Sequence, residues 1–316
     1  GWDDIIGQEQ AKRALMIAAA GAHNLIFTGP PGTGKSLLAS RLLRLLPPLS
    51  ADEALDVAAL YSVKHTVTRD IIAGCRPFRS PHHTSSAVAL TGGGASPAPG
   101  EVSLAHHGVL FLDELPEFGR RALDVLREPL ETGEVHISRA SGQATFPARF
   151  QLIAAMNPSP TGDADDGRTP PDQILRYLSR ISGPLLDRID IQVEVPRLPD
   201  YQLTLTPENH EPEDIRQPQQ KVQQAQAVQY ERQGGLNAML PVSRLADVCA
   251  LSEEDSRFIQ MAAEKLSLSM RAFHRALKLA RTIADLEGQD TVQRNHLSEA
   301  LGYRALDNLL RQLSGI

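Results

Sequence analysis

Short apolar runs alternate with longer, mixed segments over the first two-thirds of the chain. Four of these runs have the length of buried strands, and they lie at 24–28, 109–112, 151–155 and 189–195. The segments predicted as helices lie at 3–23, 37–46, 52–63, 119–132 and 172–182. Strands that alternate with helices predict an α/β fold, built on a three-layer parallel sheet.

The rest of the chain divides into inserted segments and a helical end. Residues 134–149 predict a β-hairpin. Residues 91–100 are rich in Gly and Pro and predict a mobile tip rather than a part of the core. Several prolines among polar residues indicate a linker at 197–218, after which the chain looks helical to its end. We therefore expect a core domain at 1–196 and a small all-helical lid at 219–316.

A glycine-rich loop between the first predicted strand and the next helix carries the clearest chemical signal. It matches the phosphate-binding loop in its required context, and its residues are Gly29, Pro30, Pro31, Gly32, Thr33, Gly34, Lys35 and Ser36. The glycines let several backbone N–H groups point at one place, where the positive end of the helix dipole adds to them. We expect Lys35 to reach the β- and γ-phosphates and Ser36 to hold Mg²⁺. The loop predicts an ATP–Mg²⁺ site, against the alternative of a glycine-rich turn without a ligand.

Polar side chains follow two later strands of the predicted sheet. Asp113 and Glu114 end one strand, and Asn157 ends the next. Parallel strands present their ligands at their carboxyl ends, where the phosphate-binding loop also lies. We therefore expect Asp113 to hold Mg²⁺ through water, Glu114 to polarise the attacking water and Asn157 to help orient it. The alternatives are a solvated acidic pair and a turn asparagine before Pro158.

Two arginines are candidates for sensing or cleaving the triphosphate. Arg188 precedes the last predicted strand, a position that in a ring-forming ATPase faces the nucleotide of a neighbouring copy; Arg176 and Arg180 are lesser candidates. An arginine supplied in this way stabilises the charge on the transferring phosphoryl group. Arg271 opens a lid helix and could carry the nucleotide state to the lid. The alternatives are a surface ion pair for Arg188 and a solvated helix face for Arg271.

Composition indicates a globular protein without a membrane span, but it does not identify a substrate. The chain has 316 residues, a formal net charge of −6 and a hydrophobic content of 41%, as in ordinary globular proteins. No membrane span or apolar leader is recognisable, and the distant cysteines Cys75 and Cys249 fit a reduced, cytoplasmic protein. The acidic balance argues against a surface coated with basic charge, although local basic loops remain compatible with it.

Several phrases of the sequence together resemble the magnesium-chelatase-like branch of the AAA+ ATPases and, within it, the ComM (YifB) family. The phrases that carry the resemblance are 4–8, 29–36, 78–83, 99–115, 155–158 and 182–188. The resemblance implies a P-loop core followed by a helical lid, and assembly into a homo-hexamer when ATP is bound. It also implies that Arg188 is the arginine finger, Asn157 the first sensor and Arg271 the second sensor, and that Ile6 and Gly7 contact the nucleotide.

The family further implies ATP-driven branch migration of DNA in natural transformation, on single-stranded or branched DNA and with recombinase partners. Segments 88–100 and 134–149 would then insert into the pore of the ring. Arg139 at the expected hairpin tip, with Arg76 and Arg79, would contact phosphates. Aromatic residues make up 4% of the chain, so we expect tracking of the backbone rather than stacking on bases. A solvated turn residue is the alternative for Arg139.

The sequence departs from the family in two respects, and the resemblance leaves two rival functions open. ComM-like proteins carry an N-terminal domain similar to that of Lon, and the start at Gly1 without Met leads us to expect a fragment. Many relatives have a cysteine cluster after the sensor asparagine, but 159–171 contains none, so no zinc site is carried over. The rivals are a chelatase motor subunit and a MoxR-like protein remodeller. A P-loop kinase would instead need a site for a phosphate acceptor.

Overall fold

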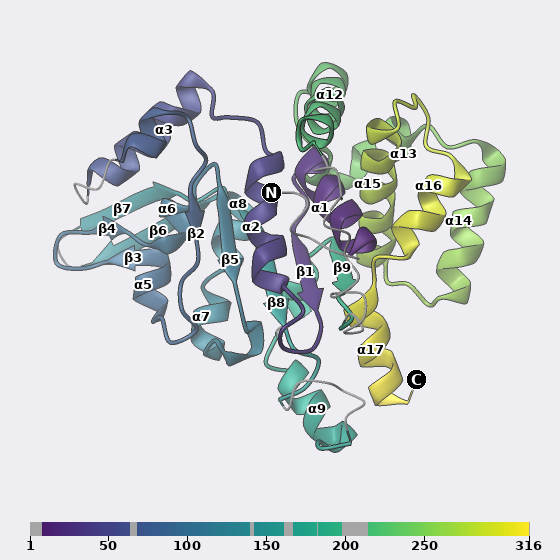
Figure 1. Cartoon of the computed structure of the whole chain (residues 1–316), viewed down its shortest axis with the longest axis horizontal. Coiled ribbons are helices and arrows are strands. Elements are labelled where there is room, and N and C mark those ends of the chain that lie inside the picture. The colour runs from purple at the N-terminus through teal and green to yellow at the C-terminus, as the bar shows by residue number, and fades with distance from the viewer. Residues whose placement is uncertain are drawn as a thin grey trace, which may run out of the picture.

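A parallel sheet forms the centre of the molecule (Figure 1). The computed structural model describes residues 8–63, 68–139, 142–160, 167–181, 183–197 and 214–315, and of Arg139 the backbone alone. Within these ranges the sheet has five strands in the order β2–β5–β8–β1–β9. They are β1 (Leu25–Thr28), β2 (Phe78–Arg79), β5 (Val109–Leu112), β8 (Gln151–Met156) and β9 (Ile191–Glu194). The predicted α/β fold with a parallel sheet is confirmed, and the short edge strand β2 is an addition to it.

Alternate residues of the strands enter two separate cores, one on each face of the sheet. Leu25 and Phe27 of β1 pack into the core covered by α1 (Glu9–Gly21) and α2 (Lys35–Leu45), whereas Ile26 packs into the opposite one. The helices that contribute to the opposite core include α7 (Arg120–Asp124), α9 (Pro171–Leu178), α10 (Gly183–Leu186) and α17 (Ala305–Ser314). Strands apolar on both faces are expected in a parallel sheet covered by helices on both sides.

An inserted body lies beside the edge strand β2, at the left of Figure 1. Its elements are α3 (Ala51–Ser62), α4 (Arg69–Ile72), α5 (Ala87–Thr91), β3 (Gly92–Gly93), β4 (Ala98–Pro99) and α6 (Glu101–Leu104). The residues expected as a mobile tip at 91–100 instead form the β3–β4 hairpin, which begins next to the buried Leu90 and ends at the buried Pro99. The glycines allow close backbone packing in this hairpin, since a Cβ on Gly92 would lie 2.4 Å from the Ala98 carbonyl oxygen. Most of 91–100 lies outside the core, as expected, and the mobility of the tip stays a prediction.

The segment between β5 and β8 agrees with the prediction, except that one expected helix is divided into two. The helix expected at 119–132 is two helices, α7 and α8 (Arg127–Thr132), with a 3₁₀ turn, η2 (Leu115–Glu117), before them. The expected hairpin is present as β6 (Glu134–Arg139) paired antiparallel with β7 (Gly142–Pro147).

The C-terminal part of the chain is helical, as predicted. Its elements are α12 (Arg216–Gln233), η3 (Asn237–Met239), α13 (Val242–Cys249), α14 (Glu253–Lys265), α15 (Met270–Leu286), α16 (Arg294–Leu301) and α17. Because α12 begins at Arg216, the last residues of the expected linker 197–218 are helical, and 198–213 lie outside the described residues. The final helix α17 leaves the lid and packs on α9 and β9, so the chain ends against the core. None of the helices in the described ranges combines the length and apolar character needed to cross a membrane.

A buried polar network joins the lid to the core. His23, which follows α1, is fully buried: its Nδ1 donates to the Asp190 carboxylate at 2.7 Å, and its Nε2 lies 2.6 Å from the Thr282 hydroxyl of α15. Within the lid, the buried Asp285 carboxylate pairs with both Arg232 and Arg281. Burial lowers the pKa of Arg281, and the charge of Asp285 acts against that shift. The network fixes α15 against α1 and the amino end of β9.

Replacing Asp285 with alanine should destabilise the lid strongly. The change removes the carboxylate that faces both Arg232 and Arg281 and leaves buried positive charge without its partner. Breaking such a buried pair typically costs about 3–5 kcal/mol. The free energy of unfolding, measured with urea, should fall by about that amount in Asp285→Ala. The exposed Asp247→Ala on α13 is the control, and equal stability of both variants would contradict the prediction.

Candidate active site

The glycine-rich loop lies at the carboxyl end of β1 and leads directly into α2. Gly34, the residue before α2, has φ of +84°, which favours glycine, and helix α2 begins at Lys35. Gly29 passes so close to the end of β9 that a Cβ would lie 2.2 Å from the Val195 carbonyl oxygen. The loop therefore depends on glycine both for its turn and for its packing. The N-terminus of α2 faces the space that the loop encloses, as a phosphate site requires.

The ammonium group of Lys35 is fixed by hydrogen bonds within this loop. Its ammonium donates to the carbonyl oxygens of Gly29 at 2.7 Å and Pro30 at 2.9 Å, and to the Asn157 side chain at 3.2 Å. The residue is 8% exposed, and burial lowers its pKa, an effect that the nearby Asp113 charge opposes. An ammonium satisfied by neutral oxygens can exchange them for the stronger acceptors of a polyphosphate.

Oxygen ligands suitable for Mg²⁺ converge beside the loop. The Ser36 hydroxyl, in the first turn of α2, lies 3.4 Å from the Asp113 carboxylate at the end of β5. A hydroxyl and a carboxylate are hard oxygen donors of the kind that Mg²⁺ accepts, together with water and substrate phosphates. The residues present therefore fit the ion that the sequence predicts. When bound, Mg²⁺ would neutralise charge on the phosphates.

The sheet order brings the remaining polar residues of this edge together. Because β8 lies between β5 and β1, Asn157 stands between Asp113 and the loop. Glu114 has φ of +54°, and its backbone N–H donates to the Asp113 carboxylate. Its own carboxylate is more than half exposed and lies 3.4 Å from His83. The structure thus groups Lys35, Ser36, Asp113, Glu114 and Asn157 at one edge, as predicted from strand direction.

Arg188 lies at the opposite, amino edge of the sheet. Its backbone precedes β9, its carbonyl accepts from Asn24 at 2.9 Å, and its side chain is 46% exposed with Glu131 at 3.4 Å. Strand β1 has four residues, which corresponds to about 13 Å between the two edges. Arg188 is therefore directed away from the loop of its own chain and is accessible from outside.

Arg271 lies with Arg188 rather than with the loop. Its exposed guanidinium pairs with Asp187, the residue before Arg188. Sequence reasoning singled out both arginines but did not foresee that the lid brings them to the same edge. The lesser candidates have other neighbours, since Arg176 pairs with Asp172 and Arg180 lies 3.8 Å from Glu117.

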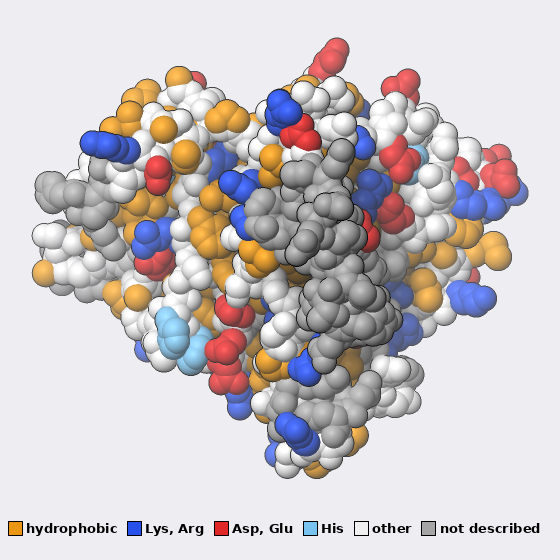
Figure 2. Space-filling model, in the orientation of Figure 1, with side chains coloured by type: hydrophobic (Ala, Val, Ile, Leu, Met, Phe, Trp, Pro, Cys, Tyr) orange, Lys and Arg blue, Asp and Glu red, His pale blue; other side chains and the backbone are white. Residues whose placement is uncertain are grey.

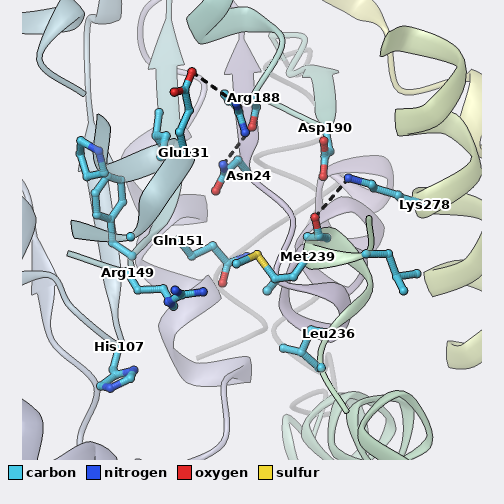
Figure 3. Close-up of a pocket in the computed structure, with 18 of the residues that line it drawn as sticks. Asn24, His107, Glu131, Arg149, Gln151, Arg188, Asp190, Leu236, Met239 and Lys278 are labelled. Atoms are coloured by element: carbon cyan, nitrogen blue, oxygen red, sulfur yellow. Dashed lines mark hydrogen bonds and ion pairs between the residues drawn. The ribbon is translucent and has the colours of Figure 1, made fainter. Parts of the chain in front are cut away.

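A hollow of about 930 Å³, lined by side chains of both charges, opens at this amino edge, between the core and the lid (Figure 3). The carboxylates in its lining are those of Glu53, Glu131, Asp187 and Asp190. Its cationic lining residues include Arg149, Arg188, Arg271, Arg275 and Lys278. Figure 3 shows Arg149 and Arg188 on either side of Asn24, with Lys278 on the lid side. Sequence reasoning missed Arg149, although the available signal was the same as for Arg188: a cation just before a strand.

The basic residues expected to contact DNA differ in their surroundings. Arg76 donates to Glu53 and to two backbone carbonyl groups, and Arg79 forms a two-bond pair with Glu101 at 2.7 and 2.8 Å. These guanidinium groups serve the packing of the inserted body. The side chain of Arg139 lies outside the described residues, as do Ile6 and Gly7.

Two family models match the chain in the order of its two parts. The model described as magnesium chelatase, subunit ChlI, matches residues 1–203. The model of the ChlI C-terminal region matches residues 213–304. The first includes the sheet with its loop, and the second most of the lid helices.

Named relatives resemble the chain over most of its length. The competence protein ComM of Haemophilus influenzae is 53% identical over 315 residues, which are 99% of this chain and 62% of the relative. The uncharacterized protein YifB of Escherichia coli is 52% identical over 312 residues, 98% of this chain and 61% of the relative. The magnesium-chelatase 38 kDa subunit of Cereibacter sphaeroides is 28% identical over 208 residues, 60% of this chain and 57% of the relative.

The chain spans about three-fifths of the length of ComM and YifB. Within that span the sequence match is nearly continuous, and the matched segments contain both the nucleotide loop and the edge that carries Arg188. The chain belongs to the magnesium-chelatase family of AAA+ ATPases.

Proposed function

We propose that this chain is the ATP-hydrolysing part of a ring motor that acts on DNA and moves branch points, as the ComM family resemblance implies. The observation that supports the ring is the separation of two half-sites. The phosphate loop lies at the carboxyl edge of the sheet, whereas Arg188 and Arg271 lie at the amino edge beside the hollow between core and lid. When one surface of a copy binds the opposite surface of the next copy, the copies assemble head to tail, and they close into a ring if the rotation per copy divides a full turn.

Each residue of the two half-sites has a role in this proposal. Lys35 binds the β- and γ-phosphates, and Glu114 accepts the proton of the water that attacks the γ-phosphorus. Asn157, already bonded to Lys35 at 3.2 Å, orients that water. Arg188 of one copy stabilises the charge that develops on the phosphoryl group bound by the next copy. Arg271 acts beside Arg188, so the lid follows the neighbouring nucleotide.

Contact with DNA is assigned to the β6–β7 hairpin, at whose end Arg139 lies. A ring multiplies each phosphate contact by the number of copies, so a modest number of basic residues per chain is sufficient. Arg76 and Arg79 do not support this part of the proposal, because Glu53 and Glu101 already engage them. Recombinase partners remain a prediction.

A chelatase motor or a protein remodeller would use the same ATPase core. Identity to the magnesium-chelatase 38 kDa subunit is 28% over 60% of the chain, against 53% over 99% for ComM. This difference favours the ComM-like reading. Stimulation of ATP hydrolysis by a protein partner and not by DNA would favour the rivals.

A strand-exchange assay on labelled three-way and four-way junctions tests the DNA motor. We expect branch migration with ATP and none with a non-hydrolysable analogue, because movement requires turnover. The Glu114→Gln variant, which should bind ATP without cleaving it, is the control for binding alone. ATP hydrolysis without any junction movement would overturn the DNA part of the proposal and leave the ATPase part standing.

Mixing two inactive variants tests whether Arg188 acts on another copy. Arg188→Ala should bind ATP but hydrolyse it about 10³–10⁵-fold more slowly, and Lys35→Ala should not bind ATP. In an equal mixture, a site is complete only where an Arg188→Ala copy supplies the loop and a Lys35→Ala copy supplies the arginine. Random assembly gives this arrangement at about a quarter of the interfaces, so the mixture should recover about a quarter of the wild-type rate.

The matched control is a mixture of Lys35→Ala with Glu114→Gln. Both residues belong to the same half-site, so no combination of these copies forms a complete site and the mixture should stay inactive. If the Arg188→Ala mixture also stays inactive while mixed rings assemble, Arg188 does not act between copies.

Reversing the charge of Arg139 tests the hairpin. Arg139→Glu should keep the basal ATPase and weaken DNA binding, and the dependence of the binding constant on salt should become less steep. Fluorescence anisotropy over a salt series measures both quantities. Arg257→Glu on α14 makes the same charge change away from the hairpin. Unchanged DNA affinity in Arg139→Glu would remove the hairpin from the proposal.

A further inference from the structure

Arg275 lies where the lid meets the core, four residues after Arg271 on helix α15. Residues at this spacing lie on the same face of a helix, one above the other. The two side chains differ in burial, since that of Arg271 is 70% exposed and that of Arg275 is 13% exposed. A largely buried guanidinium group needs partners for its donors, so the partners of Arg275 indicate its role.

The Arg275 guanidinium binds the core on both sides of Arg188. Its Nη1 donates to the Leu186 carbonyl oxygen at 3.2 Å and to the Ile189 carbonyl oxygen at 3.0 Å. The Leu186 carbonyl also accepts from the Ile189 N–H at 3.0 Å, which closes a tight turn with Arg188 inside it. One side chain of the lid therefore holds both ends of the turn that carries Arg188.

The core holds the middle of the same turn. The Asn24 side-chain amide donates to the Arg188 carbonyl at 2.9 Å, and its oxygen accepts from the Leu152 N–H at 2.8 Å (Figure 3). The carbonyl groups of Leu186, Arg188 and Ile189 are thus bound by side chains of the lid and the core together. The backbone of Arg188 is fixed from both sides.

The charged end of Arg188 is held much less firmly than its backbone. Its guanidinium is 46% exposed, and its recorded ion-pair partner among the described residues is Glu131, itself 45% exposed, at 3.4 Å. Such pairs are common on this molecule, since blue side chains lie against red ones at the left and right of Figure 2. Exposed pairs contribute little to stability. The guanidinium can therefore leave Glu131 for a phosphate oxygen, a stronger acceptor.

Arg275 is itself anchored to the sheet through the last helix. Its Nη2 donates to the Asp307 carboxylate of α17 at 3.2 Å. The Asp307 N–H in turn donates to the Gln192 side chain of β9 at 2.9 Å, and α17 packs on β9. The position of the Arg275 guanidinium is therefore defined by the sheet as well as by the lid.

We propose that Arg275 is a positioning residue, through which the docked lid fixes the direction of Arg188 toward the phosphoryl group bound by a neighbouring copy. By holding both ends of the turn, it fixes the point from which the Arg188 side chain extends. Donors that stabilise a transition state act best when they are placed before the reaction. Arg275 acts through Arg188 and does not contact the reacting atoms. The inference rests on the proposed function, in which Arg188 acts between copies, and is independent of DNA.

Steady-state ATP hydrolysis without DNA tests the role, at protein concentrations where specific activity no longer rises, so that assembly is not limiting. Arg275→Ala should lower kcat by up to about 100-fold, since a misplacement of about 1 Å can cost that much. The affinity for a fluorescent ATP analogue should stay unchanged, because the loop is intact. Arg275→Lys keeps the charge but lacks the planar fork that serves several acceptors at once. It should lose less than Arg275→Ala, and it replaces that variant in every test if the alanine variant does not fold.

Two comparisons separate positioning from a general loosening of the lid. Arg13→Ala removes another arginine between core and lid, which pairs with Glu299 of α16 away from the turn, and should keep the wild-type kcat. Arg275→Ala added to Arg188→Ala should cause no further loss, because the first residue acts through the second. An equal loss in Arg13→Ala, losses that add in the double variant, or wild-type turnover in Arg275→Ala would each overturn the positioning role.

Mixed rings show which half-site the Arg275→Ala variant damages. An equal mixture with Lys35→Ala should recover about a quarter of the wild-type rate, because Lys35→Ala copies supply a correctly directed Arg188 to intact loops. A mixture with Arg188→Ala should not exceed the rate of Arg275→Ala alone, because both defects lie in the same half-site. If Arg188→Ala recovers with Lys35→Ala but Arg275→Ala does not, the positioning role is overturned and the proposed function stands. If neither recovers although mixed rings assemble, the action of Arg188 between copies is overturned, and the positioning role with it.

Discussion

The common direction of the sheet strands is the constraint on which the rest of the molecule depends. All pairings within the five-stranded sheet are parallel, so every strand ends at one edge and begins at the other. The ends collect Lys35, Asp113 and Asn157, and the beginnings collect Arg149 and Arg188. A chain arranged in this way has the glycine-rich loop and its polar neighbours at one edge and guanidinium groups at the other, about the length of one strand away.

The lid adds to this polarity because it is docked at the amino edge. His23 reaches Asp190 on one side and Thr282 on the other, both at less than 2.8 Å, and buried polar groups in such a network are costly to separate. The docking brings Arg271 to Asp187, next to Arg188. In the proposed ring, a lid held in this position would lie closer to the nucleotide of the neighbouring copy than to its own.

Much of the fold and one half of the site followed from the sequence, and the reasons for the remainder are physical. The loop and the strand ends were predictable because motif spacing and parallel strands together determine which side chains meet. The location of Arg271 was not, since it depends on how the lid docks through His23, a contact between residues 259 positions apart. The contact of His83 with Glu114 was not foreseen, because β2 has two residues and gives almost no periodic signal. The DNA assignments of Arg76 and Arg79 required side chains free to reach phosphates, whereas Glu53 and Glu101 already pair with them.

The angle at which the lid is docked has a geometric consequence. Arg188 belongs to the core and Arg271 to the lid, so in the proposed assembly the lid angle would align a neighbouring copy that contacts both. Head-to-tail stacking closes into a flat circle only when the rotation per copy divides a full turn, and otherwise it rises as a spiral. An error of a few degrees is repeated at every step around the assembly. In the proposed assembly, the hydrogen bonds of His23, which fix the lid angle, would therefore decide between a closed ring and an open spiral.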